Sequence, residues 1–407
     1  MIDLHIFFIL GAAMALIIIL LRRHYPIGPA ILAGGLLIWL LNAPQINHLF
    51  DAGYQTLTKP RTYDLLLALY FVMCLEIELR TSGTLSGMIA ALQRLFASPK
   101  ITLAIMPAFL GLLPSLGGAR FSAPIVDEAS KGTPITAEQK STINFWFRHA
   151  FEYINPINPG MILACSIAMI PISSLIVHMG WLSIFAFAFG WLVCLTPLKV
   201  PCERPQNISQ AEHRRNIFDV FLCLTPVLVN FLLVVLFDFG AASSMGLVAI
   251  GMVLLLRLTY RVVNIKEVFL GAIDRKMLIN IICILYFIQL LTVTGTLAEI
   301  VDTFQRSPLP IPVIIGSISF VIGVLTGLSQ GHAAIVLPVV AALAPGNLDL
   351  IALAMIAGIA GQMVTPTHVC LTVTLDYFKA DFFKTLKPIV LLELLLVGVF
   401  ILKTWIL

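Results

Sequence analysis

Two arginines, Arg120 and Arg148, fall inside long apolar stretches, whereas the other 23 lysines and arginines fall in polar loops or at the ends of such stretches. A charge held inside a membrane costs free energy and commonly marks the path of a substrate or an ion. A guanidinium can bind a carboxylate through two parallel hydrogen bonds. We therefore expect an anion site in which Arg120 contacts the substrate. The alternative is a structural ion pair or a side chain that reaches the membrane surface.

Arg148 belongs to a polar stripe, because Asn144, Arg148, Glu152 and Asn155 recur at helical spacing. Arg148 and Glu152 are four residues apart and can pair on one helix face. Pairing is the usual way in which a buried charge is tolerated, so a structural pair is favoured over a coupling role. His149 lies on another face and is expected to be a packing residue.

Histidines mark the second half of the chain. His332 and His368 can donate hydrogen bonds to a substrate, and an imidazole titrates near neutrality, so a proton-coupling role is open. The alternative is hydrogen bonding to nearby backbone groups. Asp376 is either a helix-end residue or a coupling carboxylate, and the role of Glu393 stays open.

Composition sets the class of protein. Hydrophobic residues make up 59% of the 407 residues and charged residues 11%, and the mean hydropathy is +0.99. We therefore predict an all-α polytopic membrane protein. Seven cysteines are scattered singly, so neither a disulfide framework nor a metal site is expected. Apolar stretches of spanning length predict about ten crossings, at 4–21, 26–42, 63–79, 144–177, 181–198, 217–237, 243–256, 277–297, 351–377 and 389–406.

Two further apolar blocks, 101–125 and 311–343, contain Pro and Gly near their middle and are predicted to be re-entrant helical hairpins. Charge supports this prediction. With the N-terminus outside and ten crossings, nineteen lysines and arginines lie on the cytoplasmic side and four outside, as the positive-inside rule requires. Counting either block as a full crossing would move every later loop to the other side. Both termini are therefore predicted to lie outside.

The chain also divides into two halves of the same plan, 1–198 and 216–407, joined by a polar linker at 199–215. Five crossings per half is an odd number, so the halves must be inverted repeats. Inverted repeats with discontinuous helices are typical of secondary transporters. Each half is predicted to contain scaffold spans, a hairpin (101–130 and 311–343) and a broken span (144–177 and 351–377).

The breaks leave backbone groups without partners inside the membrane, where a bound ion or substrate can satisfy them. Half-helix N-termini attract anions, and unwound carbonyls suit Na⁺. The alternative is that Gly and Pro are simply common in membrane helices. The small or polar residues at the tips and breaks are the candidates for substrate binding: Ser115, Gly117, Gly118, Arg120, Asn155, Asn158, Ser329, Gln330, Gly331, His332, Thr365, Thr367 and His368.

Paired hairpins with Gly-rich tips, each followed by a span broken at Asn-Pro or Thr-Pro, resemble the ion-transporter superfamily of secondary carriers. Pro114–Arg120 and Asn155–Gly160 are most similar to an uncharacterised prokaryotic branch, known only as a domain of unknown function. The resemblance implies an elevator-type homodimer in the prokaryotic inner membrane that carries a small organic anion with Na⁺ or H⁺. The Ser-Asn-Thr signatures of dicarboxylate carriers are absent, so dicarboxylate specificity is not implied.

Other function classes fit less well. An enzyme is not expected, because His149 and Glu152 lack the spacing of a His-Glu-x-x-His metal site. A primary pump would need a Gly-x-x-x-x-Gly-Lys-Ser/Thr loop, and a channel would need a continuous pore. A cation/proton antiporter is the main alternative, since it could share the inverted repeats. The expected partners are a small anion, the lipid bilayer and a second copy of the chain, with no nucleic acid and no cofactor beyond a coupling Na⁺.

Overall fold

The computed structural model describes residues 4–95, 98–113, 119–198 and 209–406, and within these ranges the chain is helical and contains no β-strand. The helices of the first half are α1 (Leu4–Arg22), α2 (Ile27–Asn42), α3 (Ile46–Thr58), α4 (Pro60–Thr81), α5 (Thr84–Leu95), α6 (Pro99–Leu112), α7 (Ala119–Ala129), α8 (Ala137–His149), α9 (Pro159–Ala168), α10 (Ile172–Met179), α11 (Trp181–Gly190) and the π-helical η1 (Trp191–Leu195).

The second half repeats this order of long, short and paired helices. Its elements are α12 (Gln210–Val235), α13 (Ala241–Leu258), α14 (Ile265–Gly271), α15 (Arg275–Val293), α16 (Thr296–Gln305), α17 (Ile311–Thr326), α18 (Ser329–Leu343), α19 (Leu348–Met363), α20 (Val369–Phe378), α21 (Phe382–Ile401) and the π-helical η2 (Leu402–Ile406).

Several helices are suited to a membrane. Four helical segments are long and apolar enough to cross one: Gln210–Val235, Ala241–Leu258, Ile265–Val293 and Phe382–Thr404. The pair α9 and α10 passes the same test only as one bent span, since the two helices meet at 112°. Other apolar helices, such as α2, α17 and α19, have 10–17 residues. The chain is therefore an all-helical, multi-pass membrane protein, and the count of ten crossings stays a prediction.

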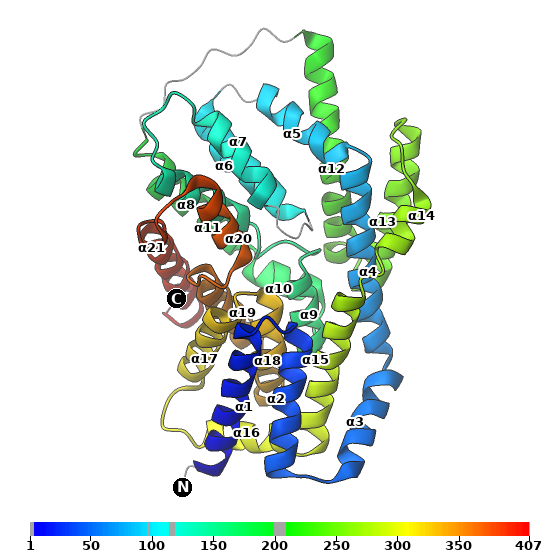
Figure 1. The fold of residues 1–407 in the computed structure, drawn as a ribbon, viewed down its shortest axis with the longest axis vertical. Coiled ribbons are helices and arrows are strands. Elements are labelled where there is room, and N and C mark those ends of the chain that lie inside the picture. The colour runs from blue at the N-terminus through cyan, green and yellow to red at the C-terminus, as the bar shows by residue number, and fades with distance from the viewer. Residues whose placement is uncertain (1–3, 96–97, 114–118, 199–208, 407) are drawn as a thin grey trace.

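The two apolar blocks with central Pro or Gly form pairs of helices, in which α6 packs against α7 and α17 packs against α18. In Figure 1 the first pair lies in the upper half of the molecule and the second pair in the lower half, with α9 and α10 between them. The connection at 114–118 lies outside the described residues. At the other connection Gly327 has φ +63°, a left-handed conformation that favours glycine.

Contacts between the two halves occur in matching pairs, in which a helix of one half and its counterpart in the other half make equivalent contacts. Helix α2 packs against α15, and α13 packs against α4. In the same way α9 packs against α18, and α20 packs against α7. Helix α19 packs against α17 and α18 and is buried from Leu350 to Met363. The arms of the hairpins are therefore held against broken helices of the opposite half.

Each broken span consists of two helices with a non-helical segment between them. Helix α8 ends at His149 and α9 begins at Pro159, while α19 ends at Met363 and α20 begins at Val369. Helices α9 and α20 then end in the same way, because Met169 and Lys379 both adopt left-handed conformations, with φ of 56° and 54°.

The first broken span, predicted at 144–177, includes α9 and most of α10. Helix α9 ends at Ala168, and α10 departs from it at 112°. Pro171 explains the end, since proline disfavours the helical conformation of the residue before it, here Ile170. The predicted linker at 199–215 overlaps the start of α12, which begins at Gln210 behind an N-cap in which Ser209 and Glu212 bond each other's backbone. Residues 199–208 lie outside the described part of the chain.

Candidate functional site

The two breaks each contain the same kind of backbone turn. The Asn155 side-chain oxygen accepts a hydrogen bond from the Ile157 N–H at 3.2 Å, and the Thr365 hydroxyl accepts one from the Thr367 N–H at 3.3 Å. In each case a proline follows, Pro156 or Pro366, which lacks a backbone donor and so cannot continue the helix. Asn-Pro and Thr-Pro therefore form the same local turn in the non-helical segments that follow α8 and α19.

Each break is also bonded to the end of its own hairpin's first arm. Asn155 donates its amide to the carbonyl of Leu112, the last residue of α6, at 3.0 Å. Thr367 donates its hydroxyl to the carbonyl of Val324 in the last turn of α17 at 3.3 Å. These bonds satisfy helix-end carbonyls that would otherwise be unpaired. They also hold each break against the C-terminal end of α6 or α17, the first helix of its own hairpin.

The tip of the second hairpin abuts the start of α9. Asn158 caps α9 by accepting a hydrogen bond from the Gly160 N–H at 2.7 Å. A Cβ at Gly160 would overlap the side chain of Ser329, the first residue of α18. Glycine at 160 is therefore required by the close approach of the two helix N-termini, which direct their free N–H groups to the same region.

Glu152 lies among these elements and joins the two halves. Its carboxylate oxygens accept hydrogen bonds from the Gln362 amide at 3.1 and 3.2 Å, and one of them accepts from Asn158 at 3.4 Å. Gln362, at the end of α19, is 1% exposed. Glu152 was predicted as a coupling or structural residue, whereas Gln362 was missed because it is a lone amide inside an apolar run.

Among the described residues no ion pair within 4 Å joins Arg148 to Glu152, whereas the Arg148 charge does interact electrostatically with the Glu152 carboxylate, so the expected pair stays a prediction. Arg148 donates to the Leu110 carbonyl at 3.1 Å and is 7% exposed. The separation of the two side chains has a local reason, because α8 ends at His149 and Glu152 lies in the turns beyond it. The helical face on which a four-residue spacing brings side chains together does not extend that far.

The two candidate histidines are buried but lie apart from Glu152's hydrogen bonds. His332 is fully buried, and neither ring nitrogen has a hydrogen-bond partner among the described residues. Its ring fits against Gly358, where a Cβ would overlap it. The His368 ring packs edge-on against Phe145 and His149, with centroids 5.2 and 4.9 Å apart.

The remaining candidates divide into three groups. Ser115, Gly117 and Gly118 lie outside the described residues, and Arg120 is described only as a backbone position near the start of α7. Gln330 and Gly331 lie with Ser329 in the first turn of α18, and Thr365 lies with Thr367 at the break. Asp376 is exposed near the end of α20, so the structure places it at a helix end rather than among the breaks.

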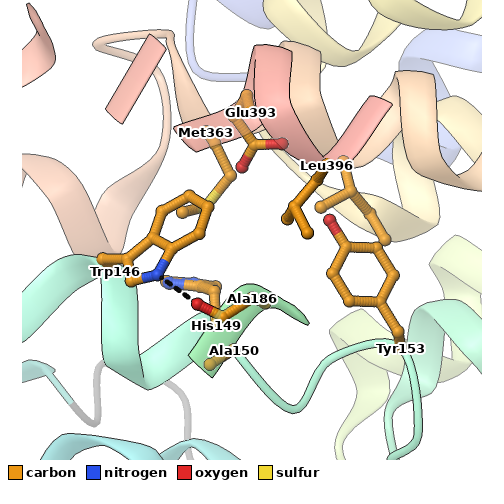
Figure 2. A pocket seen from close by; sticks show the side chains of 9 residues that line it. Trp146, His149, Ala150, Tyr153, Ala186, Met363, Glu393 and Leu396 are labelled. Atoms are coloured by element: carbon orange, nitrogen blue, oxygen red, sulfur yellow. Dashed lines mark hydrogen bonds between the residues drawn. The ribbon is translucent and has the colours of Figure 1, made fainter. Parts of the chain in front are cut away.

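A cavity lies beside the site and contains a carboxylate. Trp146, His149, Tyr153 and Glu393 are among the residues that line it, and Figure 2 shows the Glu393 carboxylate directed into it from α21. Glu393 is 5% exposed, and one of its oxygens has no hydrogen-bond partner among the described residues. The sequence signal for this residue was its charge inside the last apolar stretch.

One segment has the spacing of a hydrolase motif. Residues 327–331 read Gly-Leu-Ser-Gln-Gly, which matches Gly-x-Ser-x-Gly. In hydrolases that serine lies between a strand and a helix and is bonded to a histidine. Here the pattern connects two helices, and His332, the nearest histidine in sequence, has no hydrogen bond within the described residues. The arrangement is therefore not that of a nucleophile elbow.

Comparison with known proteins places the chain in a family. The family described as "Protein of unknown function (DUF401)" matches residues 7–406, and the chain therefore belongs to it. No curated protein matches the chain.

Proposed function

We propose that this DUF401 protein is a secondary active transporter of a small organic anion, coupled to Na⁺ or H⁺ and working by an elevator-type alternating-access mechanism. The observation that carries the proposal is the meeting of two helix breaks, one from each half, around Glu152 and Gln362. Broken helices inside a membrane provide unpaired backbone groups, and these are the usual ligands of transported ions and substrates.

Inverted repeats are part of this proposal. They are supported by the contacts that recur with the halves exchanged, α9 with α18 and α7 with α20. Further support comes from the equivalent turns at Asn155 and Thr365 and from the equivalent left-handed ends at Met169 and Lys379. A two-fold relation in the membrane plane would explain why the hairpins approach the breaks from opposite ends of the molecule (Figure 1).

An anionic substrate is favoured by the donors near the breaks. Arg148 is almost fully buried, and Arg120 is the second residue of α7. The N-termini of α9 and α18 add the positive ends of two helix dipoles at their point of contact. The Asn158 amide has two N–H groups, of which one donates to Glu152, and so keeps one neutral donor for orientation.

A cation/proton antiporter is the second candidate, and a specific observation favours it. Glu393 is buried and Glu152 is half-buried, and neither forms an ion pair within the described residues. Carboxylates of this kind are the groups on which proton or Na⁺ exchange depends. In the organic-anion transporter the same groups would bind the coupling ion.

Binding and transport assays separate the two candidates. Purified protein would be screened by thermal shift against organic acids with and without Na⁺, since a ligand that prefers the folded state raises the midpoint. Positive acids would then be tested for uptake into proteoliposomes. Saturable uptake of one acid supports the anion transporter. Exchange of Na⁺ for H⁺ without stabilisation or uptake of any acid supports the antiporter and contradicts the first proposal.

A further inference from the structure

Three side chains with metal-binding atoms lie together where α8 ends and α20 begins. His149 is the last residue of α8, His368 immediately precedes α20, and Cys370 lies in the first turn of α20. Their potential ligand atoms all lie within 4.8 Å of one another. His149 comes from the first half of the chain and the other two from the second, so only the fold brings them together.

We propose that His149, His368 and Cys370 form a binding site for a thiophilic transition-metal ion, with Zn²⁺ as the first candidate. Imidazole and thiolate ligands suit zinc and copper, whereas Mg²⁺ and Ca²⁺ prefer oxygen. Three protein ligands leave one tetrahedral position open for water or another small ligand. The site goes beyond the proposed transport function and does not depend on it.

The histidines are oriented for binding. The Nδ1 atom of His149 lies 2.8 Å from the Phe145 carbonyl oxygen, so Nδ1–H donates to it and Nε2 keeps a free lone pair. Metal-binding histidines usually have such a hydrogen bond on their other nitrogen. His368 is 6% exposed, and its Nδ1 has no hydrogen-bond partner among the described residues. A buried nitrogen of this kind is unusual, and a bound metal would satisfy it.

Small side-chain movements would complete the geometry. Zinc bonds of about 2.0–2.1 Å to nitrogen and 2.3 Å to sulfur place tetrahedral ligands roughly 3.3–3.7 Å apart. Because the ligand atoms now lie up to 4.8 Å from one another, they must approach by about an ångström to bind zinc. Cys370 is only partly buried and can change its rotamer, while Pro366 and Thr367 are exposed and leave the break accessible to an ion.

The positive charge of Arg148 makes a negatively charged thiolate ligand necessary for metal binding. The Arg148 guanidinium interacts electrostatically with both histidines, and its charge opposes a cation. On binding, the Cys370 S–H bond breaks, the proton passes to solvent and the sulfur bonds the metal as a thiolate. The thiolate charge then offsets that of Arg148. Binding of one metal ion should therefore release one proton.

Zinc titration of the purified full-length protein tests the site. We expect one Zn²⁺ per chain, with about one proton released, and slower alkylation of Cys370 by maleimide as measured on its peptide by mass spectrometry. Cobalt should give the visible spectrum of a tetrahedral site with a thiolate ligand. Cys370→Ser and His149→Ala should each weaken zinc binding by at least about tenfold, as loss of a ligand requires.

Matched controls are Cys283→Ser and His48→Ala, which change a cysteine and a histidine on α15 and α3, and both should bind zinc as the wild type does. Cys370→Ser is conservative at a partly exposed position, so a folded sample is expected even if His149→Ala is unstable. Equal zinc affinity in wild type and Cys370→Ser would overturn the proposal. So would alkylation of Cys370 that saturating Zn²⁺ does not slow.

Discussion

At the scale of single residues, Arg120 carries much of the inference of an anionic substrate. Arg120→Lys keeps the charge but loses the planar pair of donors that holds a carboxylate. We expect affinity for the identified acid to fall by about ten- to a hundredfold, corresponding to roughly 1.5–3 kcal/mol, while the protein still folds. Binding to purified protein would be measured by calorimetry. Wild-type affinity in both Arg120→Lys and Arg120→Ala would refute a substrate contact.

Glu152 and Gln362 allow a second test, because each half contributes one of them. Glu152→Ala leaves the buried Gln362 amide without its acceptor, and we expect a loss of about 1–3 kcal/mol in stability, read as a lower thermal midpoint.

The double variant Glu152→Ala with Gln362→Leu should recover part of that loss, since both partners are then removed. Asp376→Asn is the control, because Asp376 is exposed and should leave the midpoint unchanged. Additive losses in the double variant would show that the hydrogen bonds do not link the two halves energetically.

At the scale of elements, helix contacts through glycine tie each hairpin to its own broken span. A Cβ at Gly111 of α6 would overlap the Arg148 carbonyl of α8, and a Cβ at Gly323 of α17 would overlap the Gly358 carbonyl of α19. Backbone carbonyls cannot rotate away as side chains can. The equivalent contacts in the two halves fix how closely hairpin and broken span pack.

We therefore expect Gly111→Ala and Gly323→Ala to lower the thermal midpoint strongly or to prevent folding, as overpacking of a tight contact does. Gly251→Ala in α13 is the matched control, since a Cβ there meets nothing within 4 Å and alanine favours the helix by roughly 0.5–1 kcal/mol. Yields and midpoints of all three variants would be compared. Gly111→Ala and Gly323→Ala that behave like Gly251→Ala would contradict the tight packing.

The elements also show how far sequence reasoning reaches. Proline and glycine spacing indicated that each of the two apolar blocks divides into two helices and where both breaks lie, because local backbone chemistry determines where a helix ends. The short helices α3, α5, α14 and α16 were missed, since with at most 13 residues each they are too short for a hydropathy signal of their own. Contacts between distant residues, such as Glu152 with Gln362 or His149 with Cys370, depend on packing and have no signal in a single sequence.

At the scale of the whole molecule, the inverted-repeat proposal predicts that the hairpins are reached from opposite sides of the membrane. Phe121 in α7 and Leu328 at the second tip are 43% and 39% exposed, so cysteines at these positions should accept a label. In a background without native cysteines, we expect Phe121→Cys to react with a membrane-impermeant maleimide from the cytoplasmic side and Leu328→Cys from the outside.

Two exposed loop positions mark the sides in the same assay. Tyr260→Cys, at a residue 97% exposed, should report the cytoplasm, and Leu309→Cys, at a residue 57% exposed, should report the outside. Both assignments come from the distribution of lysine and arginine. Labelling of Phe121→Cys and Leu328→Cys from one side only, under all conditions of transport, would disprove the inverted arrangement.

The shortness of the half-helices has an electrical consequence. Helices α9 and α20 have 10 residues each, which corresponds to about 15 Å at 1.5 Å per residue. The hydrocarbon core of a bilayer is about 30 Å thick. If water reaches the breaks from either side, the membrane voltage falls across only the thin remaining barrier. An ion bound at the breaks would then cross most of the membrane voltage while moving through only part of the membrane's thickness. Crossing the full voltage changes the free energy of one charge by about 2.3 kcal/mol at 100 mV.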